Sequence, residues 1–305
     1  LRTVLSDMYK ELITGSTLSE TLVNHKESFP EMFVSMVQAG EISGNIERVM
    51  CRLATHYEKE WKIQSKVKSA MVYPAVLSIV ATAVVIFLLT NVMPTFVDLY
   101  SSSGVPLPFV TLMMLNMSQW IKNMWYVIVL VVLLFIVSFS KLSKCEKIRY
   151  MIDSYKLRIP LFRTLKIKLV ASRFTRTLST LVGSGVPLLE GLDSVAMVAG
   201  NEYIKRIILN AREDVRKGSS LSYSIKNQNL FPQMVHYMIK IGEESGEIEE
   251  VLDKTADFYD EEAENTIQKL VVMIEPMMIV IMAAIIGFIM LAMVTPMFDM
   301  VNTVQ

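Results

Sequence analysis

A stretch of about 70 residues occurs twice in this chain, which constrains the fold more than any other feature of the sequence. Residues 29–96, here called the first copy, return without a gap as residues 231–298, the second copy. Pro74 matches Pro276, and Phe96 matches Phe298. An unbroken register of this length indicates that a whole structural unit was duplicated. Each copy passes from a polar helical region directly into a long apolar segment. The repeated unit is therefore predicted to be a soluble domain followed by a membrane helix.

Three apolar blocks make the chain a predicted membrane protein. The chain is 52% hydrophobic, with a mean hydropathy of +0.41. The blocks cover residues 75–93, 124–139 and 271–298. Each can supply the roughly 17–25 residues that cross a hydrocarbon core about 30 Å thick, and a buried helix of a soluble protein rarely runs so long without a charge. We therefore predict three transmembrane helices, over residues 71–97, 121–140 and 271–298.

Basic residues are distributed asymmetrically about these blocks. Lysines precede the first span, and lysines and an arginine follow the second, whereas the connector, residues 98–120, contains neither. Because cytoplasmic flanks are enriched in Lys and Arg, the connector is predicted outside and both polar domains in the cytoplasm. This places the N-terminus inside and the short tail, residues 299–305, outside. A second span between the copies is required to keep both soluble domains on one side.

The polar regions are predicted to form two helical-bundle domains, residues 1–70 and 141–270, so that the fold class is all-α. Apolar spacing and turn residues in the second domain predict helices over 174–181, 187–199, 202–217 and 221–225, a fifth from 231, a turn over 242–246 and a long sixth helix from about 247 into the third span. The first domain matches only the later part of this pattern. We therefore expect that roughly 35 or more residues precede Leu1 in the natural protein. Thr17 and Glu20 have the spacing of a capping box.

Composition and spacing exclude several function classes. The formal net charge is zero, and no basic patch predicts nucleic-acid binding. Cys51 and Cys145 both fall on the predicted cytoplasmic side and are interpreted as reduced packing residues.

An acidic run in the second domain lacks neighbouring His or Cys and the spacing of an EF-hand, so it is interpreted as a solvated helix face or as a face for a basic partner. The run comprises Asp253, Asp257, Asp260, Glu261, Glu262 and Glu264. No catalytic residue, cofactor or metal site is predicted.

The motif Gly-Glu-x-Ser-Gly appears once in each copy and is the first candidate site. Its residues are Gly40, Glu41, Ser43 and Gly44 in the first copy and Gly242, Glu243, Ser245 and Gly246 in the second. In one interpretation the glycines adopt positive φ and end a helix, the serines cap the next helix, and the carboxylates lie near its positive end. In the other, the motif contacts a partner protein or the sister domain.

The second candidate site lies at the start of the predicted membrane spans. Tyr73-Pro74 in the first copy corresponds to Glu275-Pro276 in the second. An ionisable group at membrane depth is costly and is a functional candidate by default. Glu275 is interpreted either as an anchoring or helix-packing residue or as a direct contact for a charged group of a membrane substrate.

Together these motifs carry a family resemblance. Three features occur twice: Phe-Pro-x-Met, Gly-Glu-x-Ser-Gly, and a long helix that leads into Tyr-Pro or Glu-Pro. The match also includes segment 174–190 (FTRTLSTLVGSGVPLLE) and the ending Pro296-x-Phe298. Over essentially its whole length the chain resembles the F-family platform proteins of bacterial type II secretion systems and their type IV pilus assembly counterparts. The shortened first domain departs from the family.

The resemblance implies a non-enzymatic scaffold in the inner membrane. Such a scaffold couples a cytoplasmic hexameric ATPase to the extraction and polymerisation of pilins or pseudopilins. The implied partners are that ATPase, pilins or pseudopilins, inner-membrane alignment subunits, further copies of the same chain and membrane lipid. The competing class is a membrane transporter or intramembrane enzyme, which needs polar residues that converge within the membrane. The first two spans offer few polar side chains in their interiors, among them Ser78, Thr82, Thr90 and Asn91, and no nucleophile–base pair.

Overall fold

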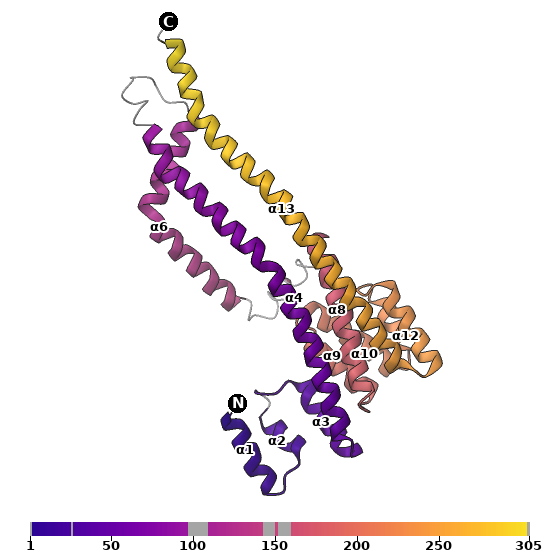
Figure 1. The fold of residues 1–305 in the computed structure, drawn as a ribbon. Coiled ribbons are helices and arrows are strands. Elements are labelled where there is room, and N and C mark those ends of the chain that lie inside the picture. The colour runs from indigo at the N-terminus through magenta and orange to yellow at the C-terminus, as the bar shows by residue number, and fades with distance from the viewer. Residues whose placement is uncertain (1, 26, 97–108, 143–149, 152–159, 304–305) are drawn as a thin grey trace. The chain divides into compact units, whose positions relative to one another are not determined.

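A computed structural model describes residues 2–25, 27–96, 109–142, 150–151 and 160–303 (Figure 1). Every element within these residues is a helix. The chain divides into two compact units. Unit 1 comprises Leu1–Val67 and Cys145–Ile267, and unit 2 comprises Lys68–Lys144 and Gln268–Gln305. The polar parts of both sequence copies therefore belong to one unit, and the apolar parts belong to the other.

The first half of unit 1 contains three short helices and the start of a long one. They are α1 (Arg2–Ile13), α2 (Leu18–Asn24), α3 (Glu31–Ser43) and α4 (Ile46–Phe87). The predicted capping box begins α2, because the Glu20 backbone N–H donates to Thr17 Oγ1 at 3.2 Å and the Thr17 backbone N–H donates to Glu20 Oε2 at 2.9 Å. This prediction is confirmed.

The second half of unit 1 is a larger bundle around the beginning of α13 (Figure 1). Its helices are α8 (Pro160–Val182), α9 (Leu188–Val198), α10 (Glu202–Arg216), α11 (Leu221–Asn227), α12 (Gln233–Ser245) and α13 (Ile248–Thr303). The predicted helices agree with these, except that α8 begins well before residue 174. The continuous α13 confirms that the sixth helix runs on into the third apolar block.

The core of unit 1 follows from amphipathic spacing. In α10, Ile204, Ile207, Ile208 and Ala211 lie on one face and are buried, and Asn201 Oδ1 caps the helix by accepting from the Ile204 N–H at 3.0 Å. One apolar cluster includes residues of both halves, from Met36 and Leu53 to Phe174 and Ile239. The two polar regions therefore share a hydrophobic core rather than forming separate cores.

Unit 2 is built from the later parts of α4 and α13, a π-helical turn η1 (Leu88–Val92) and α6 (Phe109–Leu142). Its small core contains Leu89, Met93, Met114 and Ile289. The π-helical turn alters the backbone hydrogen-bond pattern, and the carbonyl of Leu89 accepts from Ser118 Oγ at 2.6 Å. Thr111 Oγ1 donates to the Ala292 carbonyl at 2.7 Å, so α6 is tied to both neighbouring helices.

Two helices among the described residues are long and apolar enough to cross a membrane. They are Ile46–Phe96 and Ile248–Val294, whose most apolar 18-residue windows have mean hydropathies of 2.5 and 2.9. Only 17% of each window is buried within the protein. A core helix of a soluble protein would be mostly buried, whereas these windows are mostly exposed, and exposed apolar surfaces of this size are typical of membrane or protein contacts.

The predicted second span, residues 121–140, lies within α6. The helix begins at Phe109, earlier than predicted, and has non-helical dihedral angles at Met124 (φ −122°, ψ 20°). This kink lies where the predicted apolar block starts. Much of the predicted connector, residues 98–108, lies outside the described residues, as does Cys145.

Candidate functional site

The Gly-Glu-x-Ser-Gly motif is the last turn of a helix rather than a separate turn. Helices α3 and α12 run through Ser43 and Ser245, and the glycine that follows each serine is left-handed, with φ of 70° at Gly44 and 75° at Gly246. The sequence prediction of a turn over the whole motif is therefore wrong. The final glycine alone reverses the chain, because a left-handed residue without a Cβ ends a helix at little cost.

The first glycine of each motif has a different role from the last. Gly40 and Gly242 lie inside their helices, and no positive φ is found there. A Cβ built on Gly242 would stand 2.8 Å from Ile248 Cα, and one on Gly40 would stand 3.0 Å from Val49 Cγ2. The missing side chain lets the following long helix pass close to the backbone, so the interpretation that all four glycines supply positive φ is corrected.

The motif glutamates cap a helix that precedes them in the chain. Glu41 accepts hydrogen bonds from the Leu18 N–H at 2.6 Å, from the Ser19 N–H at 2.9 Å and from the Ser19 hydroxyl. Glu243 repeats this arrangement, accepting from the Leu221 N–H at 2.5 Å, the Ser222 N–H at 3.2 Å and the Ser222 hydroxyl at 2.5 Å. Because these N–H groups begin α2 and α11, each carboxylate lies at a helix N-terminus.

The prediction that these carboxylates lie near the start of a helix is therefore correct, but it named the wrong helix. The two carboxylates do not cap α4 and α13, which follow them. Burial raises the pKa of Glu41, but the hydrogen bonds from Ser19 and Leu18 outweigh it, so the pKa of Glu41 is lowered overall. Of the serines, Ser245 Oγ accepts from the Glu247 N–H at 3.3 Å, whereas Ser43 Oγ donates to the Gly40 carbonyl and does not cap α4.

A buried arginine joins α8 to α13 at a place that the sequence interpretation missed. Arg176 is only 6% exposed. Its guanidinium donates to Asp253 at 2.5 Å, to Asp257 at 2.5 Å and to Asp260 at 2.7 Å. Burial by itself lowers the pKa of Arg176, but the hydrogen bonds and charges of Asp260 and Asp257 raise it by more. The pKa of Arg176 is therefore raised overall, and the arginine remains charged.

The acidic run therefore faces basic partners within the same chain. Lys59 of α4 donates to Asp257 at 2.8 Å, and Lys168 of α8 donates to Glu262 at 2.6 Å. Of the two interpretations of the run, the face for a basic partner applies to these residues, with the partner supplied by the same chain, while Asp253 and Asp257 remain about half exposed to solvent. The spacing of Asp253, Asp257 and Asp260, which places them on one helix face, was the available signal.

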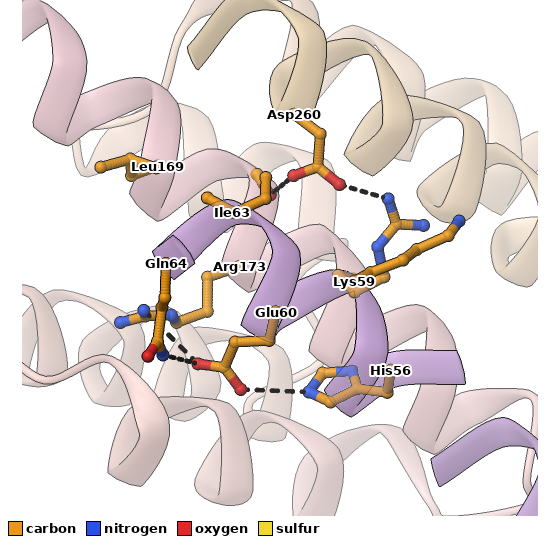
Figure 2. A pocket seen from close by; sticks show the side chains of 10 residues that line it. His56, Lys59, Glu60, Ile63, Gln64, Leu169, Arg173 and Asp260 are labelled. Atoms are coloured by element: carbon orange, nitrogen blue, oxygen red, sulfur yellow. Dashed lines mark hydrogen bonds and ion pairs between the residues drawn. The ribbon is translucent and has the colours of Figure 1, made fainter. Parts of the chain in front are cut away.

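A small polar cavity of about 40 Å³ lies among α4, α8 and α13 (Figure 2). Figure 2 shows His56 and Arg173 turned toward Glu60, with Asp260 reaching in from α13. His56 Nε2 lies 3.9 Å from Glu60 Oε2, and His56 Nδ1 lies 3.4 Å from Thr180 Oγ1. Burial lowers the pKa of His56; Glu60 opposes this shift, and the charges of Arg176 and Arg173 add to it.

Mild acidification is expected to destabilise unit 1 through His56. The unfolded histidine has an ordinary pKa of 6.5, and the folded one titrates lower. As pH falls below 6.5 the unfolded state therefore binds more protons than the folded state, and stability decreases by about 1.4 kcal/mol for each pKa unit of lowering. Melting temperatures of the detergent-solubilised chain between pH 8 and pH 5 measure this. His56→Gln should flatten the profile in that window; an equally steep profile in the variant would contradict the assignment.

The remaining candidate residues are not gathered into a reactive site. Cys51 is exposed, so its interpretation as a packing residue is wrong. Within the described ranges, no group of three or more His, Cys, Asp or Glu side chains is arranged to hold a metal ion. Pro74 and Pro276 lie within the continuous helices α4 and α13, with Pro74 buried and Tyr73 and Glu275 exposed.

The polar residues of the first apolar block bond to their own helix. Ser78 donates to the Pro74 carbonyl at 2.7 Å, Thr82 to the Ser78 carbonyl at 2.8 Å, and Thr90 to the Ile86 carbonyl at 2.8 Å. Asn91 Nδ2 reaches the Phe87 carbonyl at 3.4 Å. These bonds to the carbonyl four residues earlier satisfy the side chains locally, so these polar groups do not converge as a transport or catalytic site requires.

Comparison with known proteins identifies the family. The family model for the type II secretion system (T2SS) protein F matches residues 1–94 and 174–296, and the chain belongs to this family. It is 34% identical over 305 residues to the type IV pilus assembly protein PilC of Pseudomonas aeruginosa, covering 100% of this chain and 82% of that protein. It is 36% identical over 304 residues to the type II secretion system protein F of Vibrio cholerae, covering 99% and 74%. PilC of Thermus thermophilus is 33% identical over 305 residues, covering 100% and 75%.

Proposed function

We propose that this chain is an inner-membrane platform protein of a type IV pilus or type II secretion machine. The observation that carries the proposal is the pair of family matches, each of which covers a polar region and the apolar helix that follows it. Relatives that cover the chain along its whole length are named for pilus assembly and for type II secretion. The role is mechanical rather than catalytic: the protein transmits motion and does not transform a substrate.

In the proposed arrangement the chain crosses the membrane three times. The spans are residues 71–97, 121–140 and 271–298, both polar regions lie in the cytoplasm, the N-terminus is inside and the C-terminus outside. The absence of Lys and Arg from residues 98–120 supports this orientation. A cytoplasmic hexameric ATPase then acts on unit 1, and the spans move against pilins or pseudopilins in the membrane. Alignment subunits, lipid and a second copy of the chain complete its surroundings.

The exposed end of each motif is the proposed contact for the ATPase. The carboxylates of Glu41 and Glu243 are occupied by the helix starts that they cap. A partner would therefore meet the neighbouring position, which is Ile42 in the first copy, 82% exposed, and Glu244 in the second, also exposed. In this proposal the two interpretations of the motif apply to different residues. Glu41 and Glu243 stabilise the fold by capping α2 and α11, and residues 42 and 244 face the partner.

Deletion of the gene in the source organism should abolish pilus assembly or type II secretion while the pilin or pseudopilin accumulates in the inner membrane. Surface pili, secreted proteins and membrane fractions are measured before and after complementation. Complementation by Glu275→Gln tests the membrane contact separately, with Met277→Leu, an exposed neighbour that stays apolar, as its control. Unchanged piliation and secretion in the deletion strain would overturn the proposed function, whereas full activity of Glu275→Gln would remove only the role of that carboxylate.

A further inference from the structure

Three ion pairs connect α4 to α13 within unit 1. Arg52 pairs with Glu249, Lys59 with Asp257 at 2.8 Å, and Lys66 with Glu264. All the cations come from the first copy, and all the anions come from the second. The basic residues recur every seven positions, which keeps them on one face of α4. We call these three pairs the ladder.

The ladder joins the two helices with a separation that differs from the sequence repeat. Its partners lie 197, 198 and 198 residues apart. Equivalent residues of the two copies lie 202 residues apart, as Pro74 and Pro276 do. Each residue of α4 therefore faces a residue about four positions before its own equivalent. Four residues are about one helical turn, or about 6 Å along the axis.

The charges distinguish this staggered pairing from the one in which equivalent residues would face each other. In the equivalent pairing Arg52 would stand opposite Lys254, and Lys66 would stand opposite the uncharged Gln268. Of the three ladder cations, only Lys59 would meet an acid, Glu261; among the ladder acids, Glu264 would meet Lys62, but Glu249 would face Glu47. Like charges that face each other are destabilising, and a lost partner removes a favourable pair. The two copies have thus diverged in charge at the positions where they meet.

A groove of about 850 Å³ lies near the start of the two helices, lined by Cys51, Arg52 and Lys59 of α4 and by Glu249 and Asp253 of α13. Long charged side chains span it. Gly183 lies beneath the first pair, since a Cβ there would clash with Arg52 Nη1 and Glu249 Cδ.

We propose that the ladder determines the register of the two copies, holding α4 and α13 one helical turn out of the alignment that the duplication alone would give. The partner that this surface of α4 recognises is the acidic face of the second copy, in the same chain. The consequence is that the two Gly-Glu-x-Ser-Gly turns, although repeated in sequence, are not presented equivalently. The inference rests on the charges and their spacing and is independent of the proposed function.

Distances between spin labels on the full chain in detergent test the register. Cys51 is exposed and lines the groove, so it takes one label after Cys145→Ser removes the other native thiol. The second label is placed on Glu250→Cys or on Lys254→Cys, which replace the two partners of an exposed surface pair. The staggered register predicts that position 250 lies nearer to Cys51 than position 254. A nearer position 254 would overturn the proposal.

Charge reversal tests whether the ladder causes the register. Arg52→Glu with Lys66→Glu should abolish the difference between the two label positions, and adding Glu249→Arg with Glu264→Lys should restore it. Lys10→Glu with Lys240→Glu reverses two exposed cations outside the ladder and should change nothing. Gly183→Ala should perturb the first pair without removing a charge. If the difference between positions 250 and 254 stayed the same after charge reversal, the proposal would be overturned. It would also be overturned if a mixture of chains that each carry one label gave the same distances, because the distances would then be between chains rather than within one.

Discussion

Replacing Arg176 with Met should destabilise unit 1 by about 2–4 kcal/mol, the largest effect expected from a single substitution in this chain. The arginine is 6% exposed and forms ion pairs with Asp253, Asp257 and Asp260. Removing one partner of a buried ion pair costs about 3–5 kcal/mol, because the other partner is left uncompensated. We reduce this range because the carboxylates of Asp253 and Asp257 are about half exposed. Thermal unfolding of the detergent-solubilised chain should show a melting temperature lower by roughly 6–12 °C.

Two control variants distinguish this network from surface pairing. Arg176→Lys retains the charge but not the fork of donors that reaches three carboxylates, so it should lose about half as much stability. Arg216→Met removes an exposed arginine that pairs with Glu213 in the same helix turn, and it should cost less than about 1 kcal/mol. A loss in Arg176→Met no larger than that in Arg216→Met would show that the network contributes little.

Replacing Glu243 with Ala should cost about 2–3 kcal/mol. The carboxylate accepts from the N–H groups of Leu221 and Ser222 and from the Ser222 hydroxyl, which together begin α11. Hydrogen bonds to a charged group contribute about 1.5–3 kcal/mol, and loss of a helix cap costs about 0.5–2 kcal/mol. The measurement is the free energy of unfolding from denaturant titration of the full chain.

The neighbouring residue provides the matched control for this prediction. Glu244→Ala removes the same charge one position later, where the side chain is exposed and pairs with Lys240 at 3.6 Å, so stability should change by less than about 0.5 kcal/mol. Binding of the proposed ATPase should show the opposite pattern, reduced by Glu244→Ala and retained by the folded fraction of Glu243→Ala. Equal stability of the two variants would contradict the capping role of Glu243.

The order and extents of the helices could be largely predicted from the sequence. Amphipathic spacing identified α10, proline and glycine identified both ends of α9 and the start of α12, and the Thr17–Glu20 spacing identified the start of α2. These are local signals, carried by residues within one or two helical turns. The motif was harder to interpret: Glu41 caps a helix that starts 23 residues earlier, and no spacing rule within a helix reports such a contact.

What the sequence determined by itself is the duplication, the all-helical class and the apolar segments, because each follows from periodicity and composition along the chain. The tertiary structure decided how the copies meet. It placed the acidic face of α13 against Arg176 and the lysines of α4, and it set those pairs 197 and 198 residues apart. Charge complementarity acts through space between residues that are far apart in sequence. The repeat in the sequence therefore could not reveal that its two copies pack against each other with a shift of about one helical turn.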